Sequence, residues 1–255
     1  MFGVPPAVVW AMTLIDRWEL RSGGIPVATT PAVQRLTALL ALQGPHDRAW
    51  IAGQLWPECN ERHAHGALRS ALWRIRQQHP GLVRAAGGAI ALDPAVRLDV
   101  DRIVSRAASI LEDGRTTPDA LAVLSAGDLL PGWYDDWVML HRERLHQLQL
   151  HALEHLATLL TRENDYHRAL QAGLTAVRLN PLRESAHRTV TRVHLAEGNV
   201  CEAIRQYEQC RRILASELGI APTRHFRDLL GPLLPATTTP PRAPMLVVRA
   251  PLRQL

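Results

Sequence analysis

The sequence predicts a mainly α-helical protein in two parts, a small N-terminal α+β unit followed by an all-α unit. Two observations predict this division. Over residues 14–94 the local signals run in the order hairpin, three helices, hairpin. In the C-terminal half a helical pattern repeats, so that Glu163 aligns with Glu197, 34 residues further along. We therefore predict domains at 14–94 and 97–232, followed by a flexible Pro- and Thr-rich tail at 235–255.

The N-terminal unit opens with turn chemistry between two apolar runs. The runs TLIDRWEL (13–20) and IPVAT (25–29) flank the segment Arg21-Ser22-Gly23-Gly24. A glycine pair between apolar runs favours a tight turn between two strands. The pattern predicts one two-stranded hairpin.

Three helices are predicted next, each from its end signals. Thr30-Pro31, a cap followed by a first-turn proline, begins a helix over 31–43 that stops at a Gly-Pro pair. Asp47 caps a short second helix that ends at a proline. The third helix spans Glu61–His79 and is closed by a Pro-Gly pair.

A second hairpin completes the unit. The segment LVRAAGGAIALD (82–93) predicts two short strands about Gly87-Gly88, because glycine tolerates the positive φ that a type I′ turn needs. This order of elements is typical of a winged helix-turn-helix. Its third helix enters the major groove of DNA, and its last hairpin, the wing, reaches an adjacent backbone.

The third helix combines an apolar side with a cationic side. Leu68, Leu72 and Ile75 share one side and are expected to pack on the first two helices. From Arg62 to Leu92 the chain has five arginines and three histidines but no Asp or Glu. Such a run favours an anionic partner, double-stranded DNA, because arginine neutralises phosphate and pairs in a fork with guanine. The predicted DNA-contacting residues are Arg62, Arg69, Ser70, Trp73, Arg74, Arg76 and Gln77 on the helix and Arg84 at the base of the wing.

Two points stay open at the level of sequence. Spacing does not tell which arginine reads a base and which one clamps a phosphate. Trp73 fits a contact with DNA and a cap on the edge of the core equally well.

The C-terminal unit is predicted as a helical solenoid. A short strand near residue 97 leads into a helix capped at Asp101, and a long helix spans 137–161. An offset of 34 residues, as between Ala169 and Ala203, is the period of tetratricopeptide helix pairs, in which small residues let paired helices approach closely. The repeat predicts pairs at 142–161 with 165–179 and 183–197 with 199–215, then a terminal helix after Thr223.

The composition excludes several enzyme classes. The net charge of +5 comes from arginine, because the chain has no lysine. A Walker A loop, a pyridoxal Schiff base and a kinase active site all need lysine. The sequence has no nucleophile elbow and no paired carboxylates in a cleft pattern, so we expect neither an enzyme nor a cofactor.

Metal sites and membrane segments are not expected either. His151 and His155 share a helix face, but the sequence places no further ligand beside them. Cys59, Cys201 and Cys210 match neither a zinc site nor a disulfide framework. The N-terminus lacks the basic start of a secretory signal, and no apolar run reaches the roughly 18 residues of a membrane span. We expect a cytoplasmic, nucleoid-associated bacterial protein that does not bind membranes.

Several motifs, taken in series, resemble one bacterial family. They are LWPE (55–58), LRSALWRIR (68–76), LLPGWYDDWV (129–138), RLHQLQLHALEHLA (144–157), NPLRESAHR (180–188), HLAEGNVCEAIRQYEQCRRIL (194–214) and ELGIAPT (217–223). In this order, over about residues 14–232, they resemble the bacterial transcriptional activator domain proteins, and specifically the Streptomyces antibiotic regulatory protein (SARP) family. The segment LQGPHDRAW (42–50) departs from the family as an unusual joint between the first two helices.

The resemblance implies an OmpR-type winged helix-turn-helix joined to a tetratricopeptide-like activator domain. It implies a transcriptional activator that binds promoter direct repeats as a homodimer and recruits RNA polymerase through the sigma factor. It also implies that the target is a secondary-metabolite (antibiotic) gene cluster. The family's third helix aligns on Glu61–His79, so Arg69, Trp73, Arg74 and Arg76 inherit a DNA-facing role.

The chief alternative is a tetratricopeptide-like adaptor whose winged helix no longer binds DNA. The acid-free arginine run argues against it. A DNA binder loses affinity with salt at a log–log slope near −0.9 per phosphate contact, whereas an adaptor shows no duplex-dependent slope. Removing residues 101–232 is expected to spare some DNA contact and to abolish activation.

Overall fold

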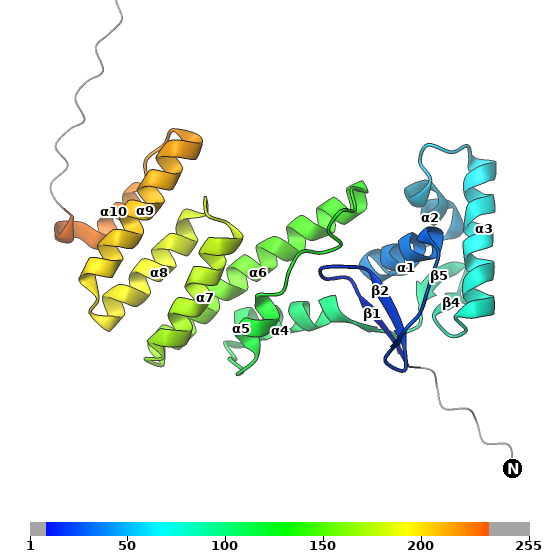
Figure 1. Cartoon of the computed structure of the whole chain (residues 1–255), viewed down its shortest axis with the longest axis horizontal. Helices are drawn as coiled ribbons and strands as arrows, with labels where there is room; N and C mark the ends of the chain where they lie inside the picture. The colour runs from blue at the N-terminus through cyan, green and yellow to red at the C-terminus, as the bar shows by residue number, and fades with distance from the viewer. Residues whose placement is uncertain (1–8, 235–255) are drawn as a thin grey trace, which may run out of the picture.

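A computed structural model describes residues 9–234, which form a small sheet and wing at one end and a stack of helices at the other (Figure 1). The predicted tail at 235–255 lies outside these residues. The fold is mainly helical, as the sequence predicts. No helix in the described part is long and apolar enough to cross a bilayer.

The N-terminal sheet has more strands than the sequence predicts. Its strands are β1 (Trp10–Thr13), β2 (Glu19–Ser22), β3 (Ile25–Pro26) and β6 (Arg97–Leu98), in the order β3-β2-β1-β6. The prediction of one strand over 13–20 is wrong, because Asp16 adopts a φ of +65° and turns the chain between β1 and β2. Aspartate is one of the few residues that tolerate this left-handed conformation. The β2–β3 turn does fall on Gly23-Gly24, as predicted.

The three predicted helices are present. They are α1 (Pro31–Gln43), α2 (Arg48–Leu55) and α3 (Glu61–Gln78). The Asp47 side chain caps α2 by accepting a hydrogen bond from the Trp50 N–H, as predicted. The Asn60 side chain caps α3 in the same way.

The wing is also present, as β4 (Val83–Ala86) and β5 (Ala89–Leu92). Gly87 and Gly88 have φ of +58° and +87°, which a type I′ turn requires. The joint between α1 and α2 is fastened to this wing. The His46 N–H donates to the Ile90 carbonyl over 3.1 Å, and the Ile90 N–H donates back over 2.8 Å.

The C-terminal unit consists of helices alone. The helix α4 begins at Asp99, two residues before the predicted cap Asp101, and Leu98 is its N-cap residue. The Asp99 carboxylate does not cap the helix but binds the segment that follows β1. This carboxylate accepts hydrogen bonds from the backbone N–H groups of Leu14 and Ile15 at 2.9–3.1 Å. The helices are α4 (Asp99–Asp113), α5 (Ala120–Leu124), α6 (Asp136–Arg162), α7 (Tyr166–Leu179), α8 (Glu184–Glu197), α9 (Val200–Leu218) and α10 (Arg224–Leu230).

The predicted helix pairs fall on α6 with α7 and on α8 with α9, and α10 is the predicted terminal helix. Ala169 of α7 and Ala203 of α9 are fully buried, as their small size suggests. These helices lie side by side in the stack (Figure 1).

The two units share backbone hydrogen bonds and a core. The Leu130 N–H donates to the Leu14 carbonyl over 2.8 Å, and the Asp16 N–H donates to the Asp128 carbonyl over 2.8 Å. Leu14 and Leu130 belong to one continuous cluster of buried apolar side chains that reaches from β1 to α8. The loop before α6 therefore pairs with the segment that follows β1, through an isolated bridge between Ile15 and Leu129.

Candidate nucleic-acid interface

The helix α3 turns an apolar face to the core and a polar face to solvent. Ala64, Leu68, Ala71 and Ile75 are buried. The prediction that Leu72 anchors the helix beside Leu68 is confirmed only in part, because Leu72 packs against the core but is half-buried and also borders a groove on the wing side. The small residues Ala64 and Ala71 complete the fully buried face.

All eight predicted contact residues are exposed side chains. At 100° per residue, Arg62, Arg69, Trp73 and Arg76 fall within about 60° of one another on the solvent side of α3, with Trp73 opposite the buried face and Arg76 on the flank next to Leu72. Ser70, Arg74 and Gln77 follow along one margin of this crest, and Arg84 lies on β4. We call the four crest residues Arg62, Arg69, Trp73 and Arg76 the α3 crest.

The arginines of this surface are not neutralised within residues 9–234. Glu61 is the only acidic residue of α3, and its carboxylate lies 3.8 Å from His65 Nε2 and makes no ion pair with an α3 arginine. In the helical unit, by contrast, several arginines have carboxylate partners, such as Arg183 with Glu154 at 2.6 Å. The α3 crest therefore keeps guanidinium groups without carboxylate partners in solvent, where they can pair with an anion.

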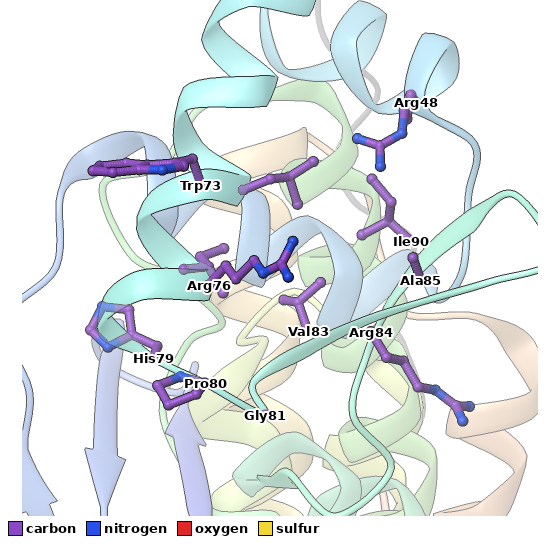
Figure 2. A pocket seen from close by; sticks show the side chains of 12 residues that line it. Arg48, Trp73, Arg76, His79, Pro80, Gly81, Val83, Arg84, Ala85 and Ile90 are labelled. Carbon is purple, nitrogen blue, oxygen red and sulfur yellow. The ribbon is translucent and has the colours of Figure 1, made fainter.

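A groove of about 500 Å³ separates α3 from the wing (Figure 2). It brings together three of the predicted residues, Trp73, Arg76 and Arg84, and adds Arg48 from the first turn of α2. Leu72, Ile75, Val83 and Ile90 provide apolar lining. The other predicted residues, Arg62, Arg69, Ser70, Arg74 and Gln77, do not line this groove.

Sequence reasoning missed Arg48. Its place depends on the pairing of His46 with Ile90, which draws the start of α2 against the wing. The His46 ring also stacks on Trp50 with ring centroids 3.6 Å apart. No local pattern signals the pairing of His46 with Ile90, 44 positions apart, so only the fold brings Arg48 to the groove that Arg84 also lines.

The structure argues against a cap on the core edge for Trp73. Its side chain is 62% exposed and lies at the rim of the groove, so it does not cap the core (Figure 2). Ser70 has a partner within the helix, since its hydroxyl donates to the Gly66 carbonyl over 3.0 Å. Its oxygen lone pairs remain available as acceptors.

The charge of the groove comes from arginine. His79 also borders it, but burial lowers the pKa of this imidazole, which favours its neutral form. Within residues 9–234 there is no cluster of three His, Cys, Asp or Glu side chains that could hold a metal ion. The arrangement offers fixed positive charge beside apolar surface.

Comparison with known proteins agrees with this architecture. Residues 97–234 match the model of the bacterial transcriptional activator domain family. The regulatory protein AfsR of Streptomyces coelicolor is 30% identical over 234 residues, which cover 84% of this chain and 23% of AfsR. The solved structure of Mycobacterium tuberculosis EmbR, in complex with a low-affinity phosphopeptide, matches with a TM-score of 0.71 and 20% identity. That match covers 87% of this chain and 64% of the EmbR chain.

The chain thus spans about a quarter of AfsR and just under two thirds of EmbR. The likeness to EmbR extends from the sheet and wing into the helical stack, so it supports the whole fold. The family match covers more than half of the 255 residues, and the chain belongs to the bacterial transcriptional activator domain family.

Proposed function

We propose that this regulator is a sequence-specific DNA-binding transcriptional activator. The observation that carries the proposal is the α3 crest, a stripe of arginines without carboxylate partners and one exposed tryptophan on the solvent side of the helix. In a winged helix-turn-helix this is the helix that enters the major groove. Arg62, Arg69, Ser70, Trp73, Arg74, Arg76, Gln77 and Arg84 are the proposed contact residues.

The chemistry of the crest suits base reading. A guanidinium group donates two parallel hydrogen bonds to guanine O6 and N7, a pattern that no other base pair presents in the major groove. Arg62 and Arg69 are exposed and lie two turns apart on one line of α3, so both can reach neighbouring base edges. The surrounding positive charge adds affinity for any duplex.

The helical unit is the proposed activation surface. Stacked helix pairs present extended surfaces that suit protein partners. By the family resemblance, the partner is RNA polymerase, contacted through its sigma factor, and the protein binds promoter direct repeats as a homodimer in the bacterial cytoplasm. The same resemblance makes a secondary-metabolite (antibiotic) gene cluster the proposed target, and nothing in this function requires an enzyme or a cofactor.

Titration of purified protein into labelled duplexes from the upstream regions of neighbouring genes tests DNA binding. We expect one region to bind at least about a thousandfold more tightly than unrelated duplex, with affinity that falls steeply as salt rises. Replacing both Arg62 and Arg69 by Ala should remove most of this preference. Arg178→Ala is the matched control, because it removes an exposed arginine of α7, far from α3 in Figure 1.

A wild-type protein that binds no duplex at low salt would contradict the proposal and favour the adaptor. A promoter–reporter assay then separates binding from activation. We expect the Arg62/Arg69 double variant to lose activation together with operator affinity, and the Arg178→Ala variant to keep both.

A further inference from the structure

The groove between α3 and the wing suggests a division of labour among the arginines, an inference that rests on the proposed DNA binding. We infer that Arg48, Arg76 and Arg84 hold the sugar–phosphate backbone of one DNA strand in this groove, and that Arg69 on the crest reads base edges. Arg48 belongs to neither the recognition helix nor the wing, and sequence reasoning did not find it.

The first argument is topological. A helix in the major groove and a wing that reaches past it straddle the backbone that borders the groove, because neighbouring grooves of a duplex are separated by a sugar–phosphate chain. Whatever lies between α3 and the wing therefore faces that backbone. On α3, Arg76 lines the groove with Leu72 and His79, whereas Arg69, two turns nearer the start of α3 on almost the same line of the helix, lies outside it.

The second argument is that the three arginines come from three different elements of the fold. Arg48 comes from α2, Arg76 from α3 and Arg84 from β4, and the three side chains border one cavity (Figure 2). Their elements are tied together, since the His46–Ile90 backbone pair fixes the start of α2 to the wing. Three cations held by three connected elements form a preorganised surface for phosphate oxygens, which loses little entropy on binding.

The third argument is the chemistry of the lining. Leu72, Val83 and Ile90 put apolar surface between the three guanidinium groups. A nucleic-acid strand offers matching features, with anionic oxygens on its phosphates and apolar faces on its deoxyribose rings. Trp73, exposed at the rim, can pack on a sugar face in the same way. A carboxylate-bearing peptide lacks this alternation of phosphate and sugar.

The salt dependence of Arg48→Ala tests the assignment. We expect the variant to lose affinity by about the same factor, near tenfold, for the operator and for an unrelated duplex, because a phosphate contact carries no base information. Its log–log salt slope should fall by about 0.9 in magnitude, the value of one lost contact. Arg69→Ala should instead lose about 5- to 150-fold on the operator and much less on unrelated duplex. Arg178→Ala serves again as the matched control.

A duplex with neutral methylphosphonate linkages locates the contact. Linkages are replaced one at a time along the strand beside the operator half-site, and each duplex is titrated with the wild type and with Arg48→Ala. We expect one linkage at which the modification weakens the wild type but leaves Arg48→Ala unchanged. The melting temperature of Arg48→Ala should match the wild type, because Arg48 is exposed.

The outcomes separate the two ideas. If the wild type binds the operator while Arg48→Ala keeps full affinity and slope, the backbone assignment is overturned and the proposed function stands. Loss confined to the operator with an unchanged slope overturns it as well, because Arg48 would then read a base. If no duplex binds the wild type, the proposed function fails and the assignment fails with it.

Discussion

His187 shows at the scale of one residue how burial fixes a protonation state. The side chain is fully buried between α8 and α9. Its Nε2 lies 2.9 Å from the Pro181 carbonyl, and its Nδ1 lies 2.7 Å from the Gln206 side-chain amide. A neutral ring that donates from Nε2 and accepts at Nδ1 satisfies both partners. Burial lowers the pKa of this imidazole, as it also lowers the pKa of His79.

We therefore expect stability to fall as the pH drops below about 6.5, the usual pKa of a histidine in an unfolded chain. In that range the unfolded chain binds protons that buried His187 and His79 do not, so acid favours unfolding. Each such histidine adds up to about 1.4 kcal/mol per pH unit to the slope of unfolding free energy against pH. Denaturant unfolding at a series of pH values between 5.5 and 7.5 measures this slope.

His187→Gln should flatten the slope, because glutamine does not titrate, while lowering stability at pH 7.5. His225→Gln is the control, since His225 is exposed on α10. The explanation fails if the slope of His187→Gln equals that of the wild type.

Trp73 gives a second residue-scale prediction. Because its side chain is 62% exposed, Trp73→Ala should change the unfolding free energy by no more than about 0.5 kcal/mol. Its loss should nevertheless weaken binding to every duplex, since the ring lies at the rim of the groove that we assign to the backbone. Thermal unfolding and duplex titration of the same preparation measure the two effects. A large drop in stability with unchanged affinity would return Trp73 to a structural role.

At the scale of residues, the sequence predicts the exposed set on α3 correctly because helical periodicity is a local property. In a helix that buries Leu68 and Ile75, the positions of Arg69 and Arg74 must face solvent. Leu72 and Arg48 could not be predicted in this way. Their surroundings come from the wing, which the chain reaches only after α3.

At the scale of elements, helices α7 and α8 pack closely at a glycine. A Cβ atom built on Gly173 would lie 2.8 Å from Val190 Cγ2, and Val190 is fully buried. On α3, by contrast, a Cβ on Gly66 would meet only Arg69 Nη2, at 3.8 Å. The same substitution at the two glycines should therefore have opposite effects.

We expect Gly173→Ala to destabilise the protein by about 1–3 kcal/mol, because overpacking outweighs the gain in helix propensity. Gly66→Ala should stabilise it by up to about 1 kcal/mol, since alanine is the better helix former and the site is open. Denaturant titration of both variants gives the comparison. Equal effects would mean that α7 and α8 are not packed as closely as the structure places them.

The elements that the sequence predicts well carry their own end signals. The helix α1 begins at its proline, and α2 begins after the Asp47 cap, so both follow from neighbouring residues. The start of α4 does not. It depends on hydrogen bonds from Leu14 and Ile15 to Asp99, which lie 85 and 84 residues apart in the chain. The strand β6 likewise exists only because it pairs with β1.

At the scale of the whole molecule, the loop before α6 joins the two units. Arg142 of α6 holds this loop by donating from Nε to the Leu129 carbonyl over 2.8 Å and from Nη2 to the carbonyls of Leu130 and Trp133 over 2.5 and 3.1 Å. Asp135, at the end of the same loop, forms an ion pair with Arg35 of α1. The loop therefore contacts the sheet, α1 and α6 together.

Composition and periodicity locate a change of pattern near residue 95, and the predicted domain limits at 14–94 and 97–232 rest on that change. Composition and periodicity do not reveal that the two units pack together. The side chains buried between the units are ordinary apolar ones, such as Leu14 and Leu129, and no sequence pattern sets them apart. From sequence, removal of 101–232 was expected to spare some DNA contact. The backbone hydrogen bonds and the buried core that the two units share lead us to expect the opposite.

A fragment that ends at Asp113 should fail to fold cooperatively or to bind duplex, because it loses the loop that pairs with Leu14–Asp16 after β1 and the face of α6 that covers α1 and α4. In the full chain, Arg142→Ala should cost about 2–4 kcal/mol, since the loop carbonyls lose a charged donor. Arg144→Ala, an exposed neighbour on α6, should cost little. Calorimetry of the full chain should show one transition that Arg142→Ala shifts as a whole. Two separate transitions, with only one of them shifted by Arg142→Ala, would contradict this expectation. They would mean that the winged helix is stable without the helical unit and that the two units are joined flexibly.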